Sequence, residues 1–282
     1  MVGGITLAQK DEVTGEVTGG NSAEPFHVRP GVSLAALSDL GCQRENNEDS
    51  WGYWEPQRDA DFARKGRLAV VADGMGGYQG GEEASRLAVE VVERTYAAAD
   101  GADRQTPLAE GIIKAHEHIR EKQRIEVRLH GMGTTCTALA LLGDATRGYQ
   151  LHFAHVGDSR LYLIRGFEIS RLTRDDSYVS RLVENGLIDA EEAETHPQRN
   201  ILTAALGAGA DLIPQVPLVP IGIQSGDALL LCSDGLWGPV SEVEMQGAVS
   251  GQSPQFATQK LVALARERGG PDNITVLILA VN

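Results

Sequence analysis

The chain of 282 residues contains little cysteine, few aromatic residues and no long hydrophobic run. Its cysteines, Cys42, Cys136 and Cys232, are odd in number and far apart, which is typical of buried thiols in a reducing compartment and not of a disulfide framework. No apolar run approaches the roughly 20 residues of a membrane span, and the N-terminus lacks the basic start and apolar core of a secretory signal. We therefore expect a cytoplasmic protein that has no membrane partner.

Positive charge is also scarce. The sequence has 25 Lys and Arg against 39 Asp and Glu, which gives a formal net charge of −14. Nucleic-acid binding depends on Lys and Arg that neutralise phosphates, so this balance argues against a nucleic-acid partner. Aromatic residues make up only 5% of the chain, so the core must consist mainly of Ala, Val, Leu and Ile.

The sequence divides into a short N-terminal arm and one long domain. Residues 1–30 are rich in Gly, Thr, Glu and Val without sustained periodicity, and we expect a flexible arm there. Residues 31–282 contain no linker-like stretch and no internal repeat, which favours a single domain. Its β-type apolar runs predict strands at Val32–Leu37, Leu68–Ala72, Thr134–Leu142, Tyr149–Val156, Leu161–Arg165, Ala228–Cys232 and Ile274–Val281. Apolar stripes predict helices at Glu82–Ala99, Pro107–Val127 and Pro254–Arg268.

The order of these elements favours an α+β fold. Short turns join the β runs between residues 134 and 172, which predicts hairpins and not βαβ crossovers. Two antiparallel β-sheets packed as a sandwich, with helices on the outer faces, would bury the apolar sides of both kinds of element. The periodicity loosens at residues 177–202, where we expect two short helices.

Aspartates follow or precede the predicted buried strands. Asp73-Gly74, Asp158-Ser159 and Asp234-Gly235 each come directly after an apolar run, whereas Asp272-Asn273 precedes the last one. If the last strand runs antiparallel to the others, all of these carboxylates lie at one edge of the sandwich. Clustered carboxylates raise one another's pKa unless a cation neutralises them, and oxygen ligands without Cys or His favour Mg²⁺ or Mn²⁺. A single Asp-Gly is usually only a turn, so the prediction of a cation site depends on the repetition.

A further acidic stretch, Arg44-Glu45-Asn46-Asn47-Glu48-Asp49, follows the first predicted strand. A guanidinium next to a metal site could bind a phosphate through two hydrogen bonds. The alternative is an exposed ion pair on a loop, which the stretch alone does not exclude.

Taken together, these motifs resemble the metal-dependent protein phosphatases of the protein phosphatase 2C type, in particular the short bacterial form. The resemblance runs in order from about Leu37 to Leu279. It consists of Ser38-Asp39-Leu40-Gly41, Arg44, Asn47-Glu48-Asp49, Val71-Ala72-Asp73-Gly74-Met75-Gly76-Gly77, Met132-Gly133-Thr134-Thr135, Val156-Gly157-Asp158-Ser159-Arg160, Leu172-Thr173-Arg174-Asp175, Cys232-Ser233-Asp234-Gly235-Leu236 and Asp272-Asn273-Ile274-Thr275.

The resemblance implies a site with two Mn²⁺ or Mg²⁺ ions and a possible third. It implies that Asp73 bridges two ions, that the Gly74 carbonyl binds one, and that Asp234 and Asp272 hold the other. Asp158, with Asp234, matches the residues that hold the third, weaker ion in bacterial members. The resemblance further implies that Glu48 and Asp49 orient metal-bound waters and that Arg44 holds the phosphate of the substrate. It implies that Asn273 supports the site.

The sequence departs from the family pattern near the site. Met75 stands where eukaryotic members carry a His that is thought to protonate the leaving group. Tyr78 and Asp176 stand where many bacterial members have His, and Ala204 stands in a stretch that usually carries Arg. By resemblance, residues 177–202 form a flap over the active site. His196 lies in this flap, and Tyr78 and Asp176 lie near the predicted site or the flap, so these three residues could influence substrate choice.

The implied activity is hydrolysis of phosphoserine and phosphothreonine by a metal-activated water, without a phosphoenzyme. The implied partners are phosphorylated proteins that are substrates of a Ser/Thr kinase, and the kinase itself. We expect a monomer. Two alternatives stay open. One is a catalytically weak relative that binds phosphoproteins, and the other is a small-molecule phosphatase of the same fold.

Overall fold

The computed structural model describes residues 28–76, 80–144, 146 and 148–282. Most of the predicted arm therefore lies outside the described residues. Its last part is attached to the body of the protein, since the Arg29 amide donates a hydrogen bond of 2.9 Å to Glu55 Oε1 and Val28 packs on the core. Residues 28 and 29 thus contact the folded part, and the boundary between arm and domain stays a prediction.

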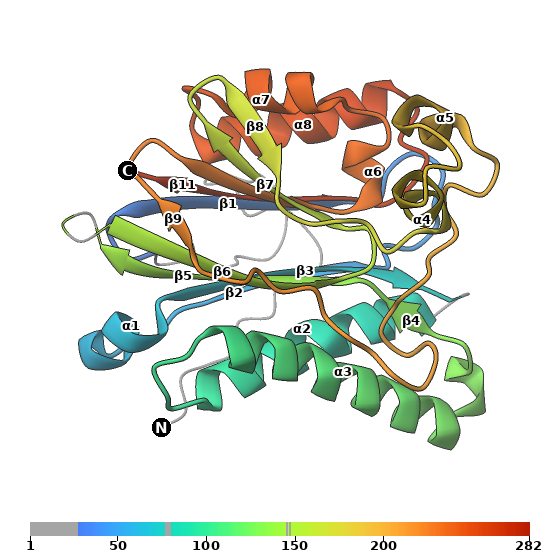
Figure 1. Cartoon of the computed structure of the whole chain (residues 1–282), viewed down its shortest axis with the longest axis horizontal. Helices are drawn as coiled ribbons and strands as arrows, with labels where there is room; N and C mark the ends of the chain where they lie inside the picture. Colours follow the sequence, from blue (N-terminus) through green and yellow to red (C-terminus); the bar gives the residue numbers. More distant parts are fainter. Residues whose placement is uncertain (1–27, 77–79, 145, 147) are drawn as a thin grey trace.

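Two antiparallel sheets form the centre of the molecule (Figure 1). One sheet contains, in spatial order, β1 (Val32–Asp39), β11 (Ile274–Val281), β10 (Ala228–Cys232), β7 (Arg160–Arg165) and β8 (Glu168–Arg171). The other contains β2 (Asp49–Trp54), β3 (Arg67–Met75), β5 (Cys136–Asp144), β6 (Gly148–Val156) and β9 (Ile221–Ile223), with the short β4 (Gly133–Thr134) paired to β3. We call them the β10 sheet and the β3 sheet.

Helices cover the outer face of each sheet (Figure 1). Those on the β3 sheet are α2 (Gly80–Ala98) and α3 (Gln105–Ile125), and those on the β10 sheet are α7 (Glu242–Val249) and α8 (Pro254–Glu267). The remaining helices are short: α1 (Asp59–Lys65), the 3₁₀ turn η1 (Val127–Leu129), α4 (Tyr178–Glu184), α5 (Ala190–Thr195) and α6 (Asp234–Trp237). The predicted α+β sandwich is confirmed.

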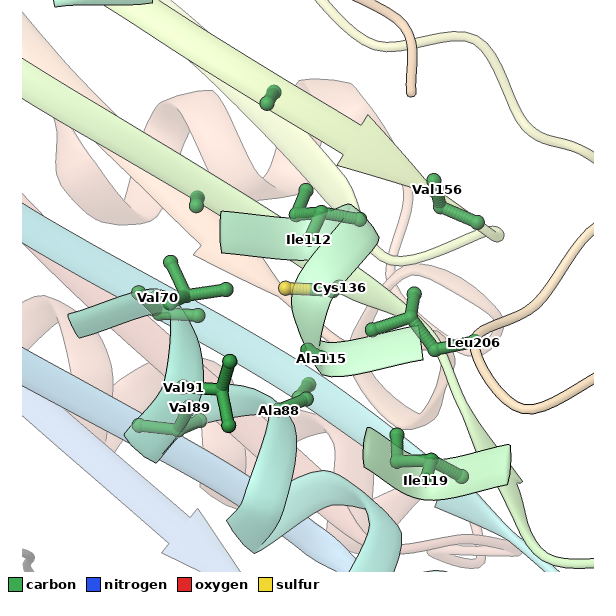
Figure 2. Packing of buried hydrophobic residues seen from close by; sticks show 14 of the residues in the cluster. Val70, Ala88, Val89, Val91, Ile112, Ala115, Ile119, Cys136, Val156 and Leu206 are labelled. Carbon is green, nitrogen blue, oxygen red and sulfur yellow. The ribbon is translucent and has the colours of Figure 1, made fainter. Parts of the chain in front are cut away.

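Aliphatic side chains fill the spaces between these layers. Leu139, Leu229 and Leu277 lie between the two sheets, while Leu230 and Leu261 lie between the β10 sheet and its helices. Figure 2 shows the layer between the β3 sheet and its helices, where Val70 and Cys136 from the strands face Val91 and Ile112 from α2 and α3. Burial of one such side chain contributes about 1.5–3 kcal/mol to the stability of the fold. The three apolar layers, one between the sheets and one between each sheet and its helices, therefore hold the strands in place.

The hairpin prediction is wrong at one connection. β5–β6 and β7–β8 are antiparallel pairs, but β6 belongs to the β3 sheet and β7 to the β10 sheet. The turn at Gly157–Ser159 therefore crosses from one sheet to the other. Gly157 has a φ of +106°, a backbone conformation that favours glycine over residues with a side chain. The crossing brings Asp158 to the edge where both sheets end.

Sequence reasoning missed several elements. β2, β8, β9, α1, α6 and α7 had not been predicted, although Ser241 and Glu244 form a capping box that marks the start of α7. Cys42 is a further correction, because it is exposed on the loop after β1 and not buried, whereas Cys136 and Cys232 are buried as expected.

The segment that was predicted as a flap, residues 177–202, contains α4 and α5. Its ends meet, since Ser177 pairs with Leu202 and the Tyr178 amide donates to the Ile201 carbonyl over 2.8 Å. Ser177 caps α4, and Asp189 with Glu192 forms a capping box at the start of α5. We call residues 177–202 the flap segment, which lies at the same end of the sandwich as α6 (Figure 1).

Candidate active site

Seven chain segments meet at one edge of the sandwich and form a cleft of about 490 Å³. β11 runs antiparallel to β10, so the residues before β11 return to the edge where β10 ends. The residues that line the cleft come from the β1–β2 loop, the end of β3, the junction of β4 and β5, the β6–β7 turn, α6, the residues before β11 and the end of the flap segment. They are Arg44, Glu45, Asn46, Glu48, Asp73, Gly74, Met75, Gly76, Thr135, Asp158, Asn200, Leu202, Asp234 and Asp272.

The glycines that follow Asp73 and Asp234 are required by close backbone packing. A Cβ on Gly74 would lie 2.2 Å from the Gly81 carbonyl oxygen, and a Cβ on Gly235 would lie 2.0 Å from the Asn273 carbonyl oxygen. No side chain fits at these distances. The Asp-Gly pairs are therefore more than turns, because they let three backbone segments approach around the carboxylates.

Asp49 lies directly across from Asp73 in the register of β2 and β3. Its Oδ2 accepts hydrogen bonds of 2.7 Å from the hydroxyls of Ser233 and Thr275. Burial raises the pKa of Asp49 to about 7, although both hydroxyls oppose the shift, and the charge of Asp234 adds to it. The pairing of β2 with β3 was not predicted, and it is what places Asp49 beside the cleft.

Three more aspartates at this edge, Asp73, Asp158 and Asp234, also have raised pKa values. Burial raises the pKa of Asp234 to about 6, and the neighbouring Asp272 adds to the shift. Burial and neighbouring carboxylates raise the pKa values of Asp73 and Asp158 well above the ordinary range. Among the described residues, Asp234 Oδ1 is a buried oxygen without a hydrogen-bond partner. Buried oxygens of this kind need either protons or a cation.

Arg44 reaches the cleft from the β1–β2 loop and lies about half exposed. Its Nη2 donates a 2.6 Å ion-pair hydrogen bond to Asp272 Oδ2. Glu48 lies nearby, and burial raises the pKa of its carboxyl while Arg44 opposes the shift. Among the described residues that line the cleft, this guanidinium carries the only positive charge.

Asn273 holds the loop that carries Arg44 and Glu48. Its Oδ1 accepts from the Glu48 amide over 2.8 Å, and its Nδ2 donates to the carbonyls of Leu40 and Asn46 over 3.0 Å each. These three bonds fix both ends of the loop against the start of β11.

The described residues suit a hard cation without forming a closed shell around one. Several lining residues carry carboxylates, and carboxylate oxygens are ligands that Mg²⁺ and Mn²⁺ prefer. In the described part of the chain, no three Asp, Glu, His or Cys side chains are already arranged around a single ion position. Asp272 is instead paired with Arg44, and Asp234 Oδ1 remains available for a cation.

Two of the predicted substrate or flap residues lie away from the cleft lining. Asp176 Oδ2 accepts from the Gly157 amide over 3.0 Å, and the Asp176 amide donates to the Gly157 carbonyl over 2.7 Å. The Nδ1 atom of His196 accepts from the Gln198 amide. Asp176 therefore ties the flap segment to the β6–β7 turn, and the third residue, Tyr78, lies outside the described residues.

Sequence reasoning missed residues that line the cleft from the flap segment and the β1–β2 loop. Asn200 and Leu202 lie at the returning end of the flap segment, and Glu45 and Asn46 lie beside Arg44. The two loop residues sat within a motif already singled out. No sequence pattern marked Asn200 or Leu202, because the pairing of Ser177 with Leu202 is what brings them there.

Comparison with known proteins identifies the family of this chain. Residues 43–266 match the family model described as protein phosphatase 2C. The chain is 37% identical over 252 residues to the serine/threonine protein phosphatase PstP of Mycobacterium tuberculosis, covering 89% of this chain and 45% of PstP. It is 35% identical to protein phosphatase PhpP of Streptococcus pneumoniae, covering 89% of this chain and 98% of PhpP. The chain thus spans about half the length of PstP but nearly all of PhpP.

A crystal structure of the catalytic domain of PstP in complex with two manganese ions is also similar. It superposes with a TM-score of 0.74 at 35% identity, covering 89% of this chain and 98% of that domain. Sequence and fold agree: the chain belongs to the protein phosphatase 2C family.

Proposed function

We propose that this protein is a metal-dependent protein serine/threonine phosphatase. The observation that carries the proposal is the gathering of Asp73, Asp158, Asp234 and Asp272 around one cleft that also holds Arg44. Carboxylates supply the cation ligands and a guanidinium supplies the phosphate ligand, so one cleft has both parts of a phosphate-ester hydrolase. The relatives PstP and PhpP are named as protein phosphatases, which supports the same activity here.

We assign the cation ligands as follows. Asp73 and the Gly74 carbonyl would hold the first ion, with Asp73 shared by the second, and Asp234 and Asp272 would hold the second. Asp158, with Asp234, would hold a third and weaker ion. The two manganese ions in the PstP structure support Mn²⁺, and the oxygen donors suit Mg²⁺ equally. When bound, such a pair of ions lowers the pKa of a shared water, so that it can attack phosphorus at neutral pH.

The chain's own groups then orient the reactants. Arg44 would exchange its contact with Asp272 for the phosphate of the substrate, while Glu48 and Asp49 would accept hydrogen bonds from waters in the cleft. Asn273 keeps the loop that carries Arg44 and Glu48 in place. Met75 lines the cleft and has no proton to give, so the leaving group must be protonated by another group.

A covalent route through cysteine has no support. Cys232 is two residues from Asp234, but it is buried in β10, and burial raises the pKa of its thiol to about 12. A thiol of this kind is protonated at neutral pH and cannot act as a nucleophile. Water is therefore the proposed nucleophile, and no phosphoenzyme is expected.

We further propose that residues 31–282 form the catalytic domain, that its substrates are phosphorylated proteins made by a Ser/Thr kinase, and that the kinase itself is among them. We propose a cytoplasmic monomer that has no nucleic-acid partner. In the described residues, no helix has the length and apolar character needed to cross a membrane.

The test is hydrolysis of an aryl phosphate and of a phosphothreonine peptide with and without Mn²⁺. Asp234→Asn should lower both rates by at least about 100-fold because it removes a ligand charge. Asp100→Asn is the control, since that side chain is 88% exposed and distant from the cleft lining. Full activity in excess EDTA, or an unaffected Asp234→Asn variant, would refute the metal mechanism.

The same assay separates the two alternatives. A phosphoprotein-binding relative would retain the phosphopeptide in a binding assay without turning it over. A small-molecule phosphatase would hydrolyse sugar phosphates as fast as the phosphopeptide.

A further inference from the structure

We propose that Arg160, Asp175 and Trp237 form a positioning cluster that fixes Asp158 relative to Asp234. The inference rests on the proposed function, in which these two carboxylates face a cation. None of the three cluster residues lines the cleft, so they would act through the backbone that carries the two aspartates.

The first part of the cluster is a buried ion pair. Arg160 Nε lies 3.0 Å from Asp175 Oδ1, and Arg160 Nη2 lies 2.7 Å from Asp175 Oδ2. The side chains are only 15% and 7% exposed, and Arg160 Nη1 also donates to the Tyr162 hydroxyl over 3.1 Å. Two parallel bonds in a site from which water is largely excluded hold the guanidinium plane in one orientation.

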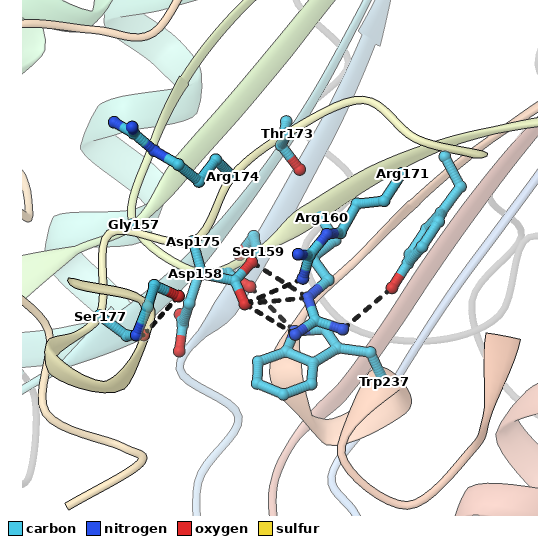
Figure 3. Close-up of polar contacts among 12 residues, drawn as sticks. Gly157, Asp158, Ser159, Arg160, Arg171, Thr173, Arg174, Asp175, Ser177 and Trp237 are labelled. Atoms are coloured by element: carbon cyan, nitrogen blue, oxygen red, sulfur yellow. Dashed lines mark hydrogen bonds and ion pairs between the residues drawn. The ribbon is translucent and has the colours of Figure 1, made fainter. Parts of the chain in front are cut away.

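The second part of the cluster is the ring of Trp237. The Arg160 guanidinium carbon lies 3.7 Å from the centre of this ring, so the two planar groups are stacked (Figure 3). The indole Nε1 donates a 2.9 Å hydrogen bond to the backbone carbonyl of Asp158. Arg160 therefore holds the indole, and the indole holds the peptide of Asp158.

Trp237 also belongs to the element that carries Asp234. Asp234 is the first residue of α6 and Trp237 is the last, and the Gly238 amide closes this turn on the Asp234 carbonyl over 2.8 Å. A single indole thus joins the β6–β7 turn to α6. The two aspartates are also linked through the β10 sheet. Arg160 of β7 pairs with Cys232 of β10, and these residues lie two positions from Asp158 and Asp234, respectively.

The flap segment begins immediately after the cluster. Asp175 precedes Asp176, which makes reciprocal hydrogen bonds with Gly157, and Ser177 opens the flap segment. Figure 3 shows Asp158, Arg160, Asp175 and Trp237 gathered around the turn. A change in the cluster should therefore alter where the carboxylates of Asp158 and Asp234 lie without removing either of them.

Trp237→Phe is the informative variant. It keeps an aromatic ring for Arg160 but removes the hydrogen bond to the Asp158 carbonyl. Trp54→Phe is the matched control, because Trp54 packs edge-on against Tyr96 away from the cleft. Mn²⁺ binding to the whole protein, measured by electron paramagnetic resonance of the free ion, and thermal unfolding in EDTA give readouts that do not depend on turnover.

We expect Trp237→Phe to weaken the weakest Mn²⁺ binding event of the parent protein by about 10- to 100-fold, as for other residues that support metal ligands. Asp158→Asn should weaken the same event. The kcat of Trp237→Phe should fall at low Mn²⁺ and recover at high Mn²⁺, with KM unchanged. Trp54→Phe should bind Mn²⁺ like the parent.

Unchanged Mn²⁺ binding in Trp237→Phe, or equal weakening of every binding event, would overturn the positioning role. A parent protein that binds no Mn²⁺ would instead refute the proposed function. If Trp237→Phe does not fold in EDTA, Arg160→Lys replaces it. That variant keeps the charge but loses the paired bonds and the stacking, and the same outcomes apply.

Discussion

At the scale of single residues, the contact between Arg44 and Asp272 joins the proposed phosphate ligand to a proposed cation ligand. The two side chains meet over 2.6 Å and are 48% and 30% exposed, so the pair is accessible to substrate. A partly exposed pair contributes little to stability. Its significance is therefore expected in catalysis and not in folding.

Arg44→Ala should lower kcat/KM for a phosphothreonine peptide by about 10- to 100-fold, since hydrogen bonds to a charged group contribute about 1.5–3 kcal/mol. The kcat/KM of Arg44→Lys should lie between those of the parent protein and Arg44→Ala, because lysine keeps the positive charge but cannot form two parallel hydrogen bonds to one phosphate. Steady-state kinetics provides the measurement. Arg266→Ala is the control, being equally exposed and paired with Asp39 over 2.7 Å. A change below twofold in Arg44→Ala would contradict the assignment.

Glu93 is a buried acid that lies outside the cleft. It is 7% exposed on α2, and a Cβ on Gly52 of β2 would come within 3.9 Å of its Oε2. Burial raises the pKa of Glu93 to about 7, and Glu90 adds to the shift. Below about pH 4.5 the Glu93 carboxyl is protonated in both the folded and the unfolded state. Between about pH 4.5 and about pH 7 it ionises in the unfolded state but keeps its proton in the folded state, which favours unfolding. Glu93 should therefore reduce stability as pH rises from about 4.5 to about 7.

Glu93→Gln should thus be nearly neutral at pH 5 and should raise the free energy of unfolding at pH 8 by roughly 1–3 kcal/mol. Urea denaturation at both pH values in saturating Mn²⁺ gives the measurement. The control is Glu110→Gln on α3, whose side chain is 56% exposed. Equal effects of Glu93→Gln at both pH values would show that the carboxyl titrates normally.

At the scale of elements, the flap segment is attached through Asp176. The Thr203 amide donates to the Asp176 carbonyl over 2.7 Å, while the Asp176 side chain accepts from Gly157 over 3.0 Å. Asp176 therefore connects the start of the flap segment, the residue after its end and the β6–β7 turn. The side-chain bond is the part that substitution can remove.

Asp176→Ala should leave the Gly157 amide without its acceptor and lower local stability by about 1–2 kcal/mol, so that amide exchange at Gly157 and Thr203 becomes about tenfold faster or more. Hydrogen exchange followed by NMR measures both sites. Asp176→Asn keeps an acceptor oxygen and should resemble the parent protein. Faster exchange of the same size in α8 would mean that the variant loosens the whole fold.

At the scale of the whole molecule, the carboxylates at the cleft couple metal, pH and stability. The pKa values of Asp49 and Asp234 are raised to about 7 and about 6. Protonation of these groups in the folded state stabilises the metal-free protein below about pH 3.8, and this contribution is lost progressively as pH rises from there through the folded-state values of about 6 and about 7. Bound cations need the ionised carboxylates. The stability that cation binding adds to the folded state therefore increases as pH rises.

In EDTA the protein should therefore unfold at a lower temperature at pH 8 than at pH 6. Mn²⁺ at about 100 times its dissociation constant should add about 2.7 kcal/mol, or about 5–10 °C, at pH 8. Circular dichroism melting curves provide the measurement, and the Glu93→Gln background removes the separate titration of that residue. A melting temperature unaffected by Mn²⁺ at pH 8 would contradict a cation site in this cleft.

The sequence by itself determined most of what the cleft contains. Apolar runs such as Leu68–Ala72 and Ile274–Val281 are typical of buried strands, and the aspartates at their ends then share an edge if the last strand runs antiparallel. Those patterns are local, because strand composition and turn chemistry depend on neighbouring residues. The order of motifs supplied the family, which the comparisons confirm.

Only the tertiary structure decided how distant residues face one another. The pairing of β2 with β3 sets Asp49 opposite Asp73, the crossing at Gly157 moves β7 into the other sheet, and the closed ends of the flap segment bring Asn200 to the cleft. Trp237 likewise meets Asp158 across 79 residues of chain. Register and sheet order depend on packing between segments far apart in sequence, and no local pattern encodes that packing.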